Sequence, residues 1–129
     1  MTRRNLLLTA LTTAIMLSGL PASQPAAAHA KLVRADPPPR SVVKVAPKVV
    51  RVWFNDELDP ILSWIIVWGA AGRRVDDGKG GVDLNDLSRK SMVVRLRPLV
   101  PGTYTVRWQA VSADDLAGVS GAFQFTVRR

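Results

Sequence analysis

The sequence contains no cysteine and only one histidine, His29, among its 129 residues. Without cysteine, no disulfide can cross-link the fold and no thiolate can bind a soft metal ion. Methionine is scarce too: Met1 and Met16 lie in or beside an apolar N-terminal stretch, and only Met92 follows it. A soft-metal site built from several thioethers is therefore not expected. If His29 serves another role, no imidazole remains to act as the base of a Ser–His–Asp or Cys–His arrangement.

A long apolar run occurs only near the N-terminus, at residues 6–20. Arg3 and Arg4 precede this run, and small residues follow it up to the three alanines at 26–28. This order of charged, apolar and small-residue regions is typical of a secretory signal peptide. We predict that residues 1–28 are removed, which makes His29 the first residue of an exported domain, 29–129. An uncleaved membrane anchor is the alternative reading of the run.

No later stretch approaches the roughly 18 to 20 consecutive apolar residues of a transmembrane helix, so none is predicted in the mature chain. The expected location is the periplasm or another part of the cell envelope. Lysine and arginine together number 18 against 10 acidic residues, and the loss of Arg3 and Arg4 leaves 16 against 10, a net charge of +6. This excess indicates a solvated surface or a recognition patch for anionic polymers or lipids. Because the cations are scattered and the chain is predicted to be exported, nucleic acid is not an expected partner.

Apolar residues alternate with polar ones along most of residues 29–129, a period typical of half-buried strands. In residues 102–111, for example, Tyr104, Val106, Trp108 and Ala110 fall on one face. The other predicted strands lie at residues 31–34, 49–55, 63–68, 92–98 and 121–127. Residues 63–68 are almost all apolar, which predicts burial on both faces, and the four tryptophans are expected in the core or on sheet faces. Short strands separated by proline and glycine predict an all-β fold, a Greek-key β-sandwich of about seven strands.

Residues 76–91 do not follow this alternation. The segment contains four aspartates, Asp76, Asp77, Asp83 and Asp86, which raises the question of a calcium site. Their spacing does not match a calcium-binding loop, so a polar loop is the favoured interpretation. Residues 82–87 are compatible with a short edge strand or a single helical turn.

Several segments together resemble one known family. They are "HAKL" (29–32), "DPPPRSVVKVAPKVVRVWFND" (36–56), "LDP" (58–60), "PGTYTVRWQAVSAD" (101–114) and "GAFQFTV" (121–127). In this order they look like the CopC family of periplasmic copper-resistance proteins. The resemblance implies a cupredoxin-like or immunoglobulin-like sandwich that carries or buffers copper outside the inner membrane. It also implies a CopD-like inner-membrane protein as a possible partner.

The position of His29 gives this resemblance a chemical basis. After cleavage, its free α-amine and its imidazole could close a chelate ring on Cu(II), which favours nitrogen and oxygen ligands in a tetragonal arrangement. Both nitrogens must lose protons to bind, so the affinity should fall as the pH drops. A Cu(I) thioether site is not expected, because Met92 reads as a core residue. The alternative is that His29 is only a polar residue beside a cleavage site.

The remaining ligands implied by the resemblance come from the loop after Val111. Asp114 matches the expected carboxylate, Asp115 stands where glycine is usual, and Leu116 replaces the expected second histidine. Asp56 matches a further acidic position. The predicted metal ligands are therefore His29, Asp114, Asp115 and Asp56, and this depleted set predicts weaker Cu(II) binding. Alternatively, Asp114 and Asp115 cap a turn.

Three classes of function follow. The first is a Cu(II)-binding protein for copper resistance or delivery. The second is a metal-free CopC-like sandwich that serves as an interaction or sensing module, and Leu116 favours it. The third, a copper oxygenase with an N-terminal histidine brace, needs a second histidine that the chain lacks. We therefore predict no enzymatic activity.

Overall fold

The computed structural model describes Gly19 and residues 29–129. Apart from Gly19, the predicted signal peptide lies outside the described residues. The described part contains eight strands and no helix. The strands are β1 (Leu32–Asp36), β2 (Val42–Val43), β3 (Val49–Phe54), β4 (Trp64–Trp68), β5 (Gly81–Val82), β6 (Ser91–Arg95), β7 (Gly102–Val111) and β8 (Gly118–Val127). Among these residues there is no helix that could cross a membrane.

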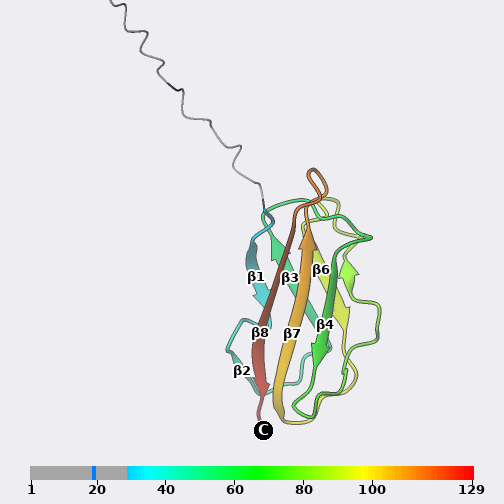
Figure 1. The fold of residues 1–129 in the computed structure, drawn as a ribbon. Coiled ribbons are helices and arrows are strands. Elements are labelled where there is room, and N and C mark those ends of the chain that lie inside the picture. Colours follow the sequence, from blue (N-terminus) through cyan, green and yellow to red (C-terminus); the bar gives the residue numbers. More distant parts are fainter. Residues whose placement is uncertain (1–18, 20–28) are drawn as a thin grey trace, which may run out of the picture.

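The strands form two four-stranded sheets, packed face to face as a sandwich (Figure 1). One sheet has the order β1-β3-β6-β5 and the other the order β2-β8-β7-β4. All neighbours are antiparallel except β2 and β8, which are parallel. Because neighbours in each sheet are often not consecutive in the chain, the connections cross between the sheets, as the predicted Greek-key sandwich requires.

The inward residues of β7 are the ones that the period-two pattern predicts. Tyr104, Val106, Trp108 and Ala110 are all buried, and their side chains meet those of the facing sheet. Trp108 packs edge-on against Phe54 at a centroid distance of 5.0 Å. Aromatic side chains bury large apolar areas and so supply much of the stabilisation of a small core that has no disulfide.

Two features differ from the sequence prediction, and a third agrees with one of its alternatives. β4 is an edge strand with β7 as its one strand partner, so burial on both faces was wrong: Trp64 is exposed, while Ile66 and Trp68 are half-buried. β2 was not predicted, because two valines in a proline-rich stretch carry no periodic signal. β5 is a short strand at the edge of its sheet, which is one of the two possibilities for residues 82–87.

The edge of β4 that does not pair with β7 is covered by Asp76, which is 2% exposed. Its carboxylate accepts hydrogen bonds from the backbone N–H groups of Val67 and Gly78, both at 2.8 Å, and from the Arg74 guanidinium at 2.7 and 2.8 Å. Burial alone would raise the pKa of Asp76, but these hydrogen bonds outweigh it, and the pKa lies below its ordinary value. Asp76 is therefore a structural carboxylate that closes a sheet edge.

Candidate functional site

Four chain segments meet at one end of the sandwich, opposite the C-terminus (Figure 1). They are residues 29–31, 55–63, 83–90 and 112–117. Seven of the ten acidic residues of the sequence lie in these segments, and we call this the acidic end. The seven are Asp56, Glu57, Asp59, Asp83, Asp86, Asp114 and Asp115. All four metal ligands predicted from the sequence, including His29, belong to these segments.

Asn55 fixes the start of the domain to this end. The Lys31 backbone N–H donates to the Asn55 side-chain oxygen at 2.7 Å, and the Asn55 N–H donates to the Lys31 carbonyl at 3.1 Å. Ala30 is fully buried in the core, whereas His29 is exposed. The histidine is thus the first residue outside a segment that is held in place by both packing and hydrogen bonds.

Asp56 is tied to the hairpin that carries Asp114. The Ser112 hydroxyl donates to one Asp56 carboxylate oxygen at 2.7 Å, and the Glu57 N–H donates to the other at 2.8 Å. The Ala113 N–H bonds to the Glu57 carbonyl at 2.9 Å, so the two segments run side by side. Since a carboxylate oxygen has more than one lone pair, Asp56 retains the capacity to bind a cation.

The hairpin between β7 and β8 is a tight turn. The Leu116 N–H bonds to the Ser112 carbonyl, and the Ala117 N–H bonds to the Asp115 carboxylate at 2.9 Å. Leu116 has a φ of 57°, in the left-handed region, and its side chain is 57% exposed. Asp115 therefore caps the turn, as the alternative from the sequence held. Asp114 is exposed and makes no side-chain hydrogen bond to the described residues.

The structure thus links Asp56 to the hairpin of Asp114 and places His29 on the segment that Asn55 holds. Within residues 29–129, no group of three or more His, Cys, Asp or Glu side chains lies close enough to hold a metal ion. Asn55 and Ser112, which position these segments, were not singled out from the sequence. Their position in the sequence could have identified them, because each is a polar residue that directly follows a strand and can form a hydrogen bond with a neighbouring loop.

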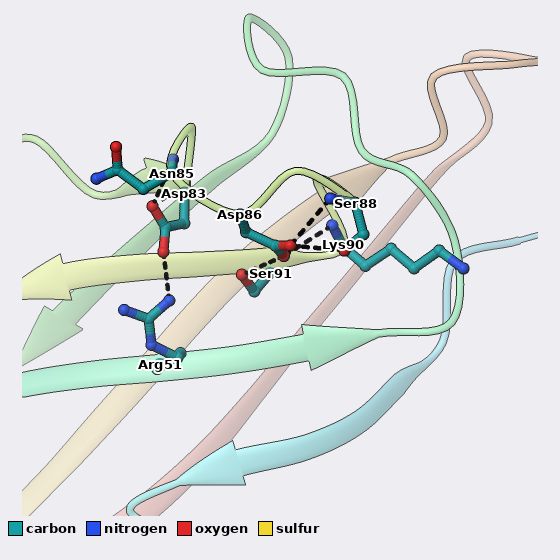
Figure 2. A network of polar contacts seen from close by, with 7 residues as sticks. All are labelled: Arg51, Asp83, Asn85, Asp86, Ser88, Lys90 and Ser91. Carbon is teal, nitrogen blue, oxygen red and sulfur yellow. Dashed lines mark hydrogen bonds and ion pairs between the residues drawn. The ribbon is translucent and has the colours of Figure 1, made fainter.

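The aspartates of residues 83–90 have partners of their own (Figure 2). Asp83 forms an ion pair with Arg51 and accepts the Asn85 N–H at 3.0 Å. Both contacts, the Arg51 hydrogen bond first, lower the pKa of Asp83.

Asp86 is held by hydroxyl groups. The hydroxyls of Ser88 and Ser91 donate to its carboxylate at 2.7 and 2.8 Å and lower its pKa. Asp83 and Asp86 therefore shape the loop through hydrogen bonds, as expected of the polar loop that the sequence favoured.

Comparison with known proteins identifies the family. A family model described as CopC domain matches residues 32–128. The chain is 31% identical over 121 residues to copper resistance protein C of Xanthomonas campestris pv. juglandis, which covers 91% of this chain and 94% of that protein. It is also 34% identical over 101 residues to copper transport protein CutJ of Bacillus subtilis (strain 168). That match covers 78% of this chain but only 18% of CutJ.

Solved structures give the same result. The sandwich is similar to CopC from Methylosinus trichosporium OB3b, with a TM-score of 0.65 and 26% identity, over 77% of this chain and 93% of that one. It is also similar to PcoC, a methionine-rich copper resistance protein from Escherichia coli, with a TM-score of 0.64 and 31% identity, over 78% of this chain and 100% of that one. Fold, family model and relatives agree, and the chain belongs to the CopC domain family.

Proposed function

We propose that this protein binds Cu(II) outside the cytoplasm, in copper resistance or copper delivery, and that the acidic end is its binding site. One observation carries the proposal. Asn55 is hydrogen-bonded to the segment that starts at His29, and the adjacent Asp56 is hydrogen-bonded to Ser112 in the hairpin of Asp114. The nitrogen donors and the oxygen donors thus belong to segments that are joined by hydrogen bonds.

The donors suit Cu(II) by chemical type. Removal of residues 1–28 gives His29 two nitrogen donors, its α-amine and its imidazole, on an exposed residue. Asp114 is exposed with its carboxylate unbonded among the described residues, and Asp56 lies on the adjoining segment. Nitrogen and oxygen ligands of this kind suit tetragonal Cu(II), and their number supports a weak or exchangeable site rather than a tight one.

Two residues of the hairpin add little to this donor set. The Asp115 carboxylate already accepts the Ala117 N–H, so metal binding there would compete with the turn. Leu116 offers no donor atom and stands where relatives of this family carry a second histidine, as the sequence resemblance implies. The ligand set that we propose is therefore His29, Asp114 and Asp56, with Asp115 as the weakest candidate.

A Cu(II) competition titration on protein that begins at His29 tests the proposal. Two controls remove the terminal chelate, one by a single extra residue before His29 and one by His29→Ala. Asp114→Ala removes the proposed oxygen donor, and Asp77→Ala removes an exposed carboxylate away from the acidic end. We expect one-to-one binding that is lost in both terminal controls and weakened by Asp114→Ala but not by Asp77→Ala. Equal weak binding in all variants would contradict the proposal.

The second candidate is a metal-free interaction or sensing module, with a CopD-like membrane protein as a possible partner. It is favoured by the apolar side chains that the acidic end exposes, Leu116 at 57%, Ile61 at 89% and Leu87 at 98%. Exposed apolar patches often mark interaction sites. If the titration finds no specific Cu(II) binding, this function replaces the first.

A further inference from the structure

The end of the sandwich opposite the candidate copper site has the opposite charge. Exposed cations gather there, and six of them form the surface that we call the basic end. They are Lys44, Lys48, Arg95, Arg97, Arg128 and Arg129. The three carboxylates of this half of the molecule are Asp36, Asp77 and the buried Asp76. Cations therefore outnumber exposed carboxylates on this surface, although they are scattered in the sequence.

The fold brings these cations together through backbone hydrogen bonds. The Leu96 N–H bonds to the Lys48 carbonyl at 2.9 Å, which joins the start of β3 to the end of β6. The Arg128 N–H bonds to the Val43 carbonyl at 2.9 Å, which joins the C-terminus to the residue before Lys44. Because both bonds are between main-chain atoms, the placement of the cations is part of the fold.

None of the six cations is neutralised by a carboxylate among residues 29–129. The described residues form two ion pairs, Arg51 with Asp83 and Arg74 with Asp76, and neither includes any of the six cations. Unpaired cations contribute little to the fold and leave a positive potential that extends about 8 to 10 Å into solution at moderate salt.

A groove of about 660 Å³ opens between these cations. Its lining includes the cations Lys48, Arg95 and Arg97 and the apolar residues Ala46, Leu96 and Leu99. Val45 and Val100 directly adjoin the lining residues Ala46 and Leu99 in the chain, and they are 83% and 71% exposed. The basic end thus combines phosphate-binding side chains with apolar groups, which is the composition of a surface that binds at a lipid–water interface.

We propose that the basic end docks on a bilayer that contains anionic phospholipids, with Lys48, Arg95 and Arg97 at the headgroup phosphates and Val45 and Val100 at the acyl boundary. Charge complementarity selects this occupant, because a neutral bilayer would leave the six cations without counter-charges. The proposal does not depend on copper binding, since the acidic end lies at the other end of the strands (Figure 1).

Vesicle flotation tests this docking. The protein used begins at His29, because the apolar residues 6–20 would bind any bilayer. It retains all eight described strands. We expect binding to vesicles of phosphatidylglycerol mixed with phosphatidylcholine, none to phosphatidylcholine alone, and release when sodium chloride is raised from about 0.05 to about 0.5 M.

Two double variants with the same change in net charge decide whether the basic end is responsible. Lys48→Gln with Arg97→Gln should weaken binding to the anionic vesicles by about tenfold or more, whereas Lys31→Gln with Arg107→Gln should weaken it by less than about threefold. Val45→Asn should weaken binding to the anionic vesicles at about 0.05 M sodium chloride, because it removes an apolar group from the acyl boundary. Unchanged thermal unfolding midpoints would show that each variant is folded.

Three outcomes would overturn the proposal. An equal loss in both double variants would assign the binding to net charge alone. Equal binding to neutral and anionic vesicles would exclude headgroup recognition. The third outcome is no vesicle binding, together with self-association in sedimentation that Lys48→Gln with Arg97→Gln abolishes. It would mean that the basic end binds the acidic end of a second copy.

Discussion

The two ends of the sandwich differ in what their charged side chains do for the fold. At the acidic end, Asp56, Asp59, Asp83, Asp86 and Asp115 each accept hydrogen bonds from the chain's own N–H, hydroxyl or guanidinium groups. At the basic end, the six cations form no ion pair with the described residues. Most of the acidic groups are therefore needed by their loops, while the basic groups are free to act outside the molecule.

This comparison also marks Asp114 as different from its neighbours. Unlike the other aspartates of the acidic end, it makes no side-chain hydrogen bond to any residue from 29 to 129. Unused polar groups on an ordered turn are better candidates for binding than groups whose lone pairs already serve the fold. The following substitutions test which charged groups are structural, in order of decreasing expected effect.

The largest effect is expected from Asp76→Ala. The change leaves the buried Val67 N–H without a partner and removes the Arg74 ion pair, so the free energy of unfolding should fall by about 2–4 kcal/mol. Urea denaturation measures the loss. Asp77→Ala is the matched control, because Asp77 is exposed and accepts only the Lys79 N–H, at 3.0 Å. Similar losses in both variants would show that Asp76 is not the structural carboxylate.

Leu116→His should act on binding rather than on stability. An added imidazole beside Asp114 supplies the donor that the hairpin lacks, and we expect Cu(II) affinity to rise by about tenfold or more in a competition titration. Leu116→Asn is the control, because asparagine suits the left-handed backbone at φ 57° but brings no imidazole. An unchanged affinity with histidine would mean that the hairpin is not part of the metal site.

Ser112→Ala tests the link between Asp56 and the hairpin. Ser112 is fully buried, and the loss of its 2.7 Å hydrogen bond to Asp56 should lower the free energy of unfolding by about 1 kcal/mol. Ser120→Ala, at an exposed position of β8, should change it by less than about 0.5 kcal/mol. Chemical denaturation compares the two variants. An unchanged free energy of unfolding in Ser112→Ala would mean that the hydrogen bond to Asp56 does not stabilise the link between the two segments.

Asp83→Asn gives the smallest expected change, about 1 kcal/mol or less at neutral pH, because the Arg51–Asp83 pair is partly exposed. Folding lowers the pKa of Asp83 below the ordinary value of 3.8, so its contribution is present above that value and is lost as the pH falls through the lowered pKa. The stability difference from the unsubstituted protein should therefore shrink in acid. A difference that persists at the lowest pH would point to a shape effect instead of charge.

The strands could be predicted from the sequence wherever one face of the strand is buried and the other is exposed to solvent. The alternation in residues 102–111 marks β7 correctly, because its inward side chains pack on the facing sheet. The same logic failed for residues 63–68, since an apolar composition does not reveal that β4 lies at an edge. β2 depends on pairing with the end of β8, a contact between residues about 84 positions apart that no local pattern encodes.

The candidate site was predictable in its residue types and less so in its geometry. The family resemblance pointed to His29, Asp56 and Asp114, and the fold places their segments at one end. Turn capping by Asp115 was an alternative that the sequence offered, but nothing in the sequence indicated that Asn55 and Ser112 would join the segments. Such contacts depend on how loops from different strands meet, which follows from topology rather than from spacing along the chain.

The length of β7 has a consequence for how the two ends can be coupled. Its ten residues, at about 3.3 Å each, separate the acidic end from the basic end by about 30 Å, three times the distance over which charges interact in salt solution. Gain or loss of a cation at one end is therefore electrically silent at the other. The protein should therefore bind the proposed membrane surface equally tightly with and without copper. The presence of copper would be detected only by a partner that contacts the acidic end.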